Sequence, residues 1–94
     1  MPDQHPRAVP RSFQLHWGAG HIVEEATVVG EYHEPAIQLL EFSDGSLSVR
    51  FCYYDHEGRF QRSPLILGQA ELAALRAALE RTPRLRAVLR QLLV

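Results

Sequence analysis

The sequence predicts an α+β fold: an antiparallel sheet of four to five strands followed by a C-terminal helix or a broken helical pair. Two observations carry this prediction. Through the first two thirds of the chain, apolar side chains alternate with polar ones and turn residues interrupt them. From residue 68 onward, the apolar spacing changes to the 3.6-residue period of a helix. Strands that precede helices, instead of alternating with them, are typical of the α+β class.

The length of 94 residues predicts one domain. Pro2, Pro6 and Pro10 lack amide donors and resist regular structure, so residues 1–11 are expected to be a disordered tail. Residues 12–94 then form the domain. No apolar run approaches the roughly 20 residues that span a bilayer, and the N-terminus has no apolar signal core. We therefore expect a cytoplasmic protein without membrane contact.

The first two predicted strands flank a glycine-rich turn. Residues 12–17 alternate between apolar and polar side chains, and Gly18-Ala19-Gly20 is expected to turn the chain. Residues 22–32 are rich in β-branched side chains, which predicts a strand. The alternation slips around Glu24 and Glu25, which predicts a β-bulge there. Adjacent strand residues point to opposite faces, so these two carboxylates are not expected to share a site.

Two hairpins follow, over residues 36–42, 47–54 and 59–67. Asp44-Gly45 favours a two-residue turn, which places Phe42 opposite Leu47. Residues 55–58 form the second turn, which places Tyr54 opposite Arg59. These registers predict two faces. The first is apolar, supports the helices and comprises Leu40, Phe42, Leu47, Val49, Phe51, Tyr53 and Phe60. The second carries Arg50, Cys52, Tyr54, Arg59, Gln61 and Ser63, with Ile37 and Leu39 beside them.

The helical part begins at Gly68, the expected N-cap, with Glu71 at the third helical position. Thr82-Pro83 is a typical stop and restart, because threonine caps a helix and proline favours its first position. Residues 65–94 carry five arginines against two glutamates. A solvated helix exterior explains this basic surface, and an acidic partner or the acidic strand of a sister subunit also fits it.

A resemblance to a known family rests on the stretch VRFCYY, from Val49 to Tyr54, and on positions after it, namely Gly58, Pro64–Leu67, Glu71, Leu72 and Leu75. This pattern, over about 40 residues, resembles the positive cofactor four family of transcriptional coactivators and its short bacterial relatives. The resemblance implies a dimer that holds single-stranded DNA on its sheets with basic and aromatic side chains. The chain departs from the family in having Arg59-Phe60-Gln61-Arg62 where lysines are usual, and in a second helical segment at 83–93.

The leading hypothesis is therefore a small, non-enzymatic module that binds single-stranded DNA, with a role in transcription or DNA maintenance. Arg50, Arg59 and Arg62 would neutralise phosphates while Tyr54 stacks on a base. A homodimer is expected because Ile37, Leu39 and the Leu85–Leu92 stripe would otherwise be exposed. The alternative is a protein-interaction or assembly domain that uses the same sheet and helix surfaces.

Catalytic and metal sites are not predicted, and no cofactor is expected. Cys52 and His56 have a Cys-x₃-His spacing across a turn, but no second pair completes a familiar tetrahedral set. Gly18-Ala19-Gly20 has no helix start after it, so it does not predict a phosphate loop. The net charge of −1 excludes a strongly basic, histone-like DNA binder.

Overall fold

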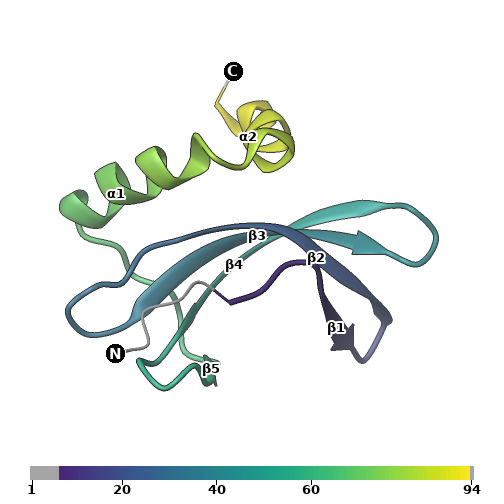
Figure 1. Cartoon of the computed structure of the whole chain (residues 1–94), viewed down its shortest axis with the longest axis horizontal. Coiled ribbons are helices and arrows are strands. Elements are labelled where there is room, and N and C mark those ends of the chain that lie inside the picture. Colours follow the sequence, from purple (N-terminus) through teal and green to yellow (C-terminus); the bar gives the residue numbers. More distant parts are fainter. Residues whose placement is uncertain (1–6, 94) are drawn as a thin grey trace.

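Five strands form one curled antiparallel sheet, and two helices cover one of its faces, which confirms the predicted α+β class (Figure 1). The computed structural model describes residues 7–93. Each strand pairs with the next along the chain: β1 (Arg11–Leu15), β2 (Gly18–Thr27), β3 (Glu34–Phe42), β4 (Leu47–Tyr54) and β5 (Phe60–Gln61). The helices are α1 (Gln69–Leu79) and α2 (Pro83–Leu89), and a 3₁₀ turn, η1 (Arg90–Leu92), follows them. The edge strands β1 and β5 curl away beneath the face opposite the helices, so that this face is concave.

Both predicted hairpins form, but each register differs from the predicted one by one residue. In the β3–β4 turn, the Gly45 amide donates to the Phe42 carbonyl, and Phe42 pairs with Ser46 instead of Leu47. In the β4–β5 turn, the Gly58 amide donates to the Asp55 carbonyl, and Asp55 pairs with Arg59. Gly45 and Gly58 have φ values of 90° and 86°. Both loops therefore have three residues and end on a left-handed glycine, a common alternative to the two-residue turn.

The register shift corrects the predicted faces. Side chains alternate with a period of two, so a shift of one residue moves β3 and β5 to the other face relative to β4. Ile37 and Leu39 face the helices, whereas Leu40 and Phe42 lie on the concave face. Phe60 pairs with Tyr54 and also lies on the concave face. The assignments within β4 were right, since Val49 packs toward the helices and Tyr54 does not.

The glycine-rich segment is a strand and not a turn. β2 begins at Gly18, and the chain turns immediately before it, at His16 and Trp17. A side chain on Gly20 would collide with the backbone of Glu41 and Phe42. Glycine at this position lets β3 approach closely enough to pair with β2.

The predicted bulge in β2 is confirmed, at Val23. The β2–β3 register shifts between Ile22 and Glu24, so that Val23 and Glu24 both face the helices. Glu25 consequently lies on the concave face, where it contacts Arg11. The two carboxylates thus point to opposite faces, as predicted.

The helix boundaries also agree with the sequence. Gly68 is the N-cap of α1, and its amide donates to the Glu71 carboxylate at 3.0 Å. Thr82 precedes Pro83 at the start of α2, but its side chain makes no capping hydrogen bond. Glu24 supplies that bond from β2 instead, accepting from the Leu85 amide at 2.8 Å. A carboxylate at a helix start also interacts favourably with the helix dipole.

The core lies between the helices and the sheet. It comprises Ala26, Ile37, Leu39, Leu75, Ala78 and Leu85, all buried within one chain. Ile37, Leu39 and Leu85 are buried, so they give no support to the expected homodimer, whereas Leu92 at the end of the predicted stripe is exposed. The dimer stays a prediction. Within residues 7–93, no helix has the length and apolar character that a membrane crossing requires.

The structure describes only part of the predicted N-terminal tail. Residues 1–6 lie outside the described residues. Residues 7–11 run along the sheet, and Arg11 begins β1. Arg7 and Arg11 both form ion pairs with Glu25 of β2, at 3.5 and 3.0 Å.

We expect Glu24→Ala to lower the free energy of unfolding by about 1 kcal/mol, because α2 loses the acceptor for the Leu85 amide. Glu24→Gln keeps an acceptor oxygen at this place and should cost less. Urea denaturation of the two variants measures the difference. An Ala variant as stable as the Gln variant would contradict the capping role.

Candidate nucleic-acid interface

The concave face holds an open hollow of about 600 Å³ between the edge strands β1 and β5. Its lining combines cationic, aromatic and polar side chains, and it includes Arg11, Gln14, His16, Arg50, Tyr54, Phe60 and Arg62. Three of the four residues predicted to bind DNA therefore line one hollow, on the face that the helices leave open.

Gln38 hydrogen-bonds three neighbouring side chains on this face. Its side chain is fully buried, and its amide donates to the Tyr54 hydroxyl at 2.9 Å and to Glu25 at 2.7 Å. Its carbonyl oxygen accepts from Nε of Arg50 at 2.7 Å. A buried polar side chain needs hydrogen-bond partners. Gln38, in β3, finds them in Glu25 of β2 and in Arg50 and Tyr54 of β4, and it thereby fixes the positions of these three side chains.

Glu25 is the charged centre of the same network. Only 3% of its side chain is exposed, and both its oxygens accept from the Arg11 guanidinium, at 3.0 and 3.1 Å. Burial alone would raise the pKa of this carboxyl, but hydrogen bonds from Arg11 and Gln38 and the charges of Arg11 and Arg7 outweigh it. The pKa of Glu25 is therefore lowered. Desolvation alone would lower the pKa of Arg11, but hydrogen bonds and charge interactions with Glu25 and Tyr54 outweigh it and raise this pKa.

Arg50 is the best placed of the predicted cations. Hydrogen bonding to Gln38 fixes its position, and its guanidinium lies 4.9 Å from the centre of the Phe60 ring. Among residues 7–93, no carboxylate lies within 4.0 Å of it. Arg50 therefore presents an uncompensated charge beside an aromatic ring.

Tyr54 lies at the predicted place, but its ring is not an open stacking surface. Only 7% of the residue is exposed. The Arg7 guanidinium covers the ring at 3.8 Å, and Phe60 packs against it edge to face with ring centres 5.6 Å apart. The hydroxyl accepts from Gln38 and Arg11. In this geometry Tyr54 supports Phe60 and the arginines, and its faces are occupied by protein.

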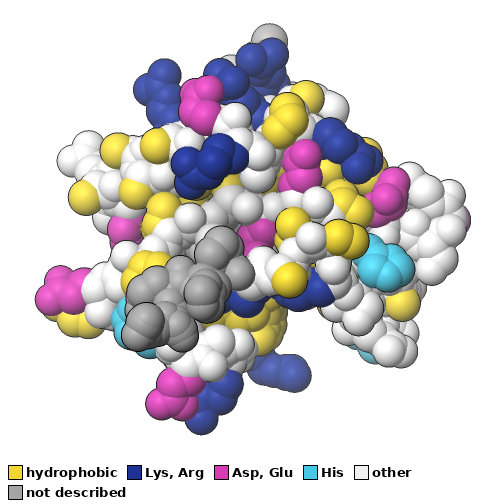
Figure 2. Space-filling model, viewed as in Figure 1, with side chains coloured by type: hydrophobic (Ala, Val, Ile, Leu, Met, Phe, Trp, Pro, Cys, Tyr) yellow, Lys and Arg dark blue, Asp and Glu magenta, His cyan; other side chains and the backbone are white. Residues whose placement is uncertain are grey.

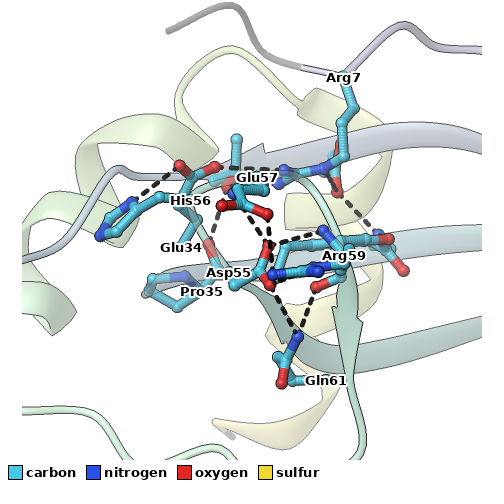
Figure 3. Close-up of polar contacts among 12 residues, drawn as sticks. Arg7, Glu34, Pro35, Asp55, His56, Glu57, Arg59 and Gln61 are labelled. Atoms are coloured by element: carbon cyan, nitrogen blue, oxygen red, sulfur yellow. Dashed lines mark hydrogen bonds and ion pairs between the residues drawn. The ribbon is translucent and has the colours of Figure 1, made fainter. Parts of the chain in front are cut away.

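Arg59 and Arg62 differ in their surroundings, although they are close in sequence. Arg59 lies in the β4–β5 loop and pairs with Asp55 and Glu57, each at 2.8 Å (Figure 3). Hydrogen bonding and charge from Asp55 raise the pKa of Arg59, and the backbone and side-chain hydrogen bonds of Arg59 lower that of Asp55. Arg62 lines the hollow and has no carboxylate within 4.0 Å among the described residues.

Two exposed aromatic side chains that pack on the concave face, those of Phe60 and Trp17, are not among the predicted site residues. Phe60 is 44% exposed beside Arg50, and Trp17 in the β1–β2 turn is 64% exposed. The Trp17 ring stacks on Phe42 with centres 5.3 Å apart. The predicted four-residue turn at residues 55–58 puts Phe60 on the helix side, whereas the observed three-residue loop puts it on the concave face. The glycines at the ends of the two loops were the signal for the correct length.

The residues considered for metal binding lie in separate environments. Cys52 is buried, and its burial raises the pKa of the thiol. His56 contacts the Glu34 carboxylate at 3.1 Å (Figure 3) and the Glu31 carbonyl at the same distance, and these two contacts raise the pKa of His56. Within the part of the chain that the structure describes, no three potential ligands cluster in a way that would hold a metal ion.

Comparison of the chain with protein-family models, with curated proteins and with solved structures found no match. The resemblance to the positive cofactor four family therefore remains an expectation from the sequence pattern.

We expect Glu25→Gln to lower the free energy of unfolding at neutral pH by about 1–3 kcal/mol, because Arg7 and Arg11 lose their charged acceptor. The lowered pKa makes this effect depend on pH. The ionised carboxylate contributes full stability above the ordinary glutamate pKa of about 4.3, and the contribution disappears as the pH falls through the folded-state value.

The wild-type protein should consequently lose more stability than Glu25→Gln when the pH is lowered from 6 to about 3. Urea denaturation at a series of pH values measures this loss, and Glu57→Gln, in the exposed loop, is the matched control. Parallel pH profiles for the wild type and Glu25→Gln would show that Glu25 does not carry this stability.

Proposed function

We propose that the concave face binds single-stranded DNA without catalysis, with Arg50 and Arg62 contacting phosphates and Phe60 stacking on a base. The observation that carries the proposal is the placement of the Arg50 guanidinium, which has no carboxylate partner among residues 7–93, at 4.9 Å from the centre of the half-exposed Phe60 ring. This pair lies in an open hollow, where a nucleotide strand has access. Proteins usually bind single strands with cationic side chains along the phosphate backbone and aromatic side chains on which the bases stack.

A single strand fits this face better than a duplex. Phe60 stacks only on a base that is not already paired and stacked in a double helix. Only two guanidinium groups in the hollow, those of Arg50 and Arg62, lack a carboxylate partner among the described residues, since Arg11 is paired with Glu25. Duplex binding rests mainly on many phosphate contacts, which this face does not offer.

The proposal changes the roles that the sequence assigned. Phe60 takes the stacking role of Tyr54, whose ring is covered by Arg7. Arg59 contributes little, because Asp55 and Glu57 already neutralise it. Trp17 extends the aromatic surface beyond the hollow, through its stacking on Phe42.

The alternative function, assembly through the same sheet surface, has less support. It would be favoured if a helix of the chain covered Arg50 and Tyr54. Both helices lie on the opposite face. Protein binding is better supported on the helix side.

The direct test is fluorescence anisotropy of a labelled oligothymidylate at low and moderate salt, with a duplex control. We expect Phe60→Ala to weaken binding about 5- to 150-fold, the range for loss of one base stack. Two phosphate contacts predict a slope of about −1.4 for log K against log salt, which Arg62→Ala should reduce by about half.

Tyr54→Phe and Arg59→Ala are the controls. Tyr54→Phe removes the hydroxyl that accepts from Gln38 and Arg11, and it should reduce stability while leaving DNA affinity close to that of the wild type. Arg59→Ala should have little effect on affinity. An absence of binding at tens of micromolar protein in low salt, or equal affinity of Phe60→Ala and the wild type, would contradict the proposal.

A further inference from the structure

A second surface, on the other side of the sheet, is an apolar groove of about 560 Å³ along α1 and α2. Leu75, Leu79 and Leu89 belong to its lining, together with Ile37 and Phe51 from the sheet. The aliphatic lining continues outward through Leu72 and Leu93. The groove therefore joins the core to the molecular surface.

Residues 7–93 leave the outer part of this groove uncovered. Phe51 and Leu72 are half exposed, and Leu93 is largely exposed. Several exposed large apolar side chains along one groove are unusual for a surface that faces only water. Burying them against a partner removes that apolar area from water and so favours association.

The rim of the groove is basic. Arg76, Arg86 and Arg90 surround it, and Glu80 is the one acidic residue in the lining. Glu80 lies 3.4 Å from Arg86. Among residues 7–93, Arg76 and Arg90 have no carboxylate within 4.0 Å. Figure 2 shows arginine side chains, in dark blue, gathered over the helices at the top of the view.

The charge determines which occupant fits. A second copy bound symmetrically through this groove would bring three arginines of each chain toward the same three of the other, with only Glu80 to offset them. Like charges placed face to face oppose association. A nucleic acid would find phosphate partners here, but the floor is aliphatic and offers bases little to stack on.

We propose that this groove binds an amphipathic helix of a partner protein, with leucine-like anchors on one face and glutamate or aspartate residues beside them. Such helices place anchors at positions i, i+3, i+4 and i+7 into a hydrophobic groove. The acidic flanks pair with Arg76 and Arg90, which fix the orientation of the helix. This inference rests on the groove alone and does not depend on DNA binding by the concave face.

The probe is a fluorescein-labelled synthetic helix of about four turns, with leucines at the anchor positions and glutamates beside them. A second peptide carries lysines in place of the glutamates. We expect the glutamate peptide to bind about tenfold more tightly than the lysine peptide at low salt, because its glutamates form two exposed ion pairs, with Arg76 and Arg90, that the lysine peptide lacks. The double substitution Arg76→Glu, Arg90→Glu should reverse this preference, and Leu72→Gln should weaken binding of the glutamate peptide.

Arg81→Glu is the control, because it makes the charge change of one of the two substitutions outside the groove and should keep the preference. Circular dichroism confirms that each variant is folded. Equal binding of the two peptides, or an unchanged preference in the double variant, would overturn the proposal. A wild-type dimer in analytical ultracentrifugation that Leu72→Glu converts to a monomer would also overturn it, because a second copy would then occupy the groove.

Discussion

The one-residue bulge at Val23 determines which chemistry appears on each face of this protein. It turns Glu24 toward the helices and Glu25 toward the concave face. Glu24 then accepts from the Leu85 amide and holds α2 on the sheet, while Glu25 accepts from Arg11 and Gln38. In a regular strand that continues from Ile22, the two carboxylates would exchange faces, and each would lie one residue away along the strand from the partners that Glu24 and Glu25 now have.

Each of the two resulting surfaces is built on one of these contacts. On the concave face, Gln38 joins Glu25 to Arg50, and the guanidinium of Arg50 lies beside Phe60. On the helix side, the cap from Glu24 fixes α2 on the sheet, and the apolar groove with its arginine rim runs along both helices. A polar, aromatic surface and an apolar, basic surface are thereby separated by a single sheet. We expect them to bind different partners.

The periodicity of the sequence predicted the fold class, the boundaries of β4 and both helix starts, because those features follow from local patterns. The faces of β3 and β5 were wrong because they depend on loop length, which two glycines determined through their backbone conformation. Tyr54 could be placed on the correct face from the sequence. Its covering by Arg7 could not, because that contact joins residues far apart in the chain. The capping of α2 by Glu24 is likewise a tertiary contact between residues 61 positions apart.

The most direct test of two separate surfaces is an NMR titration of the ¹⁵N-labelled protein with oligothymidylate. We expect chemical-shift changes at the amides of β1, β4 and β5 around Arg50, Phe60 and Arg62, with the amides of α1 and α2 unchanged. Shift changes centred on the helices and on the arginine rim of the groove would contradict it, and so would a spectrum that the oligonucleotide leaves unaltered.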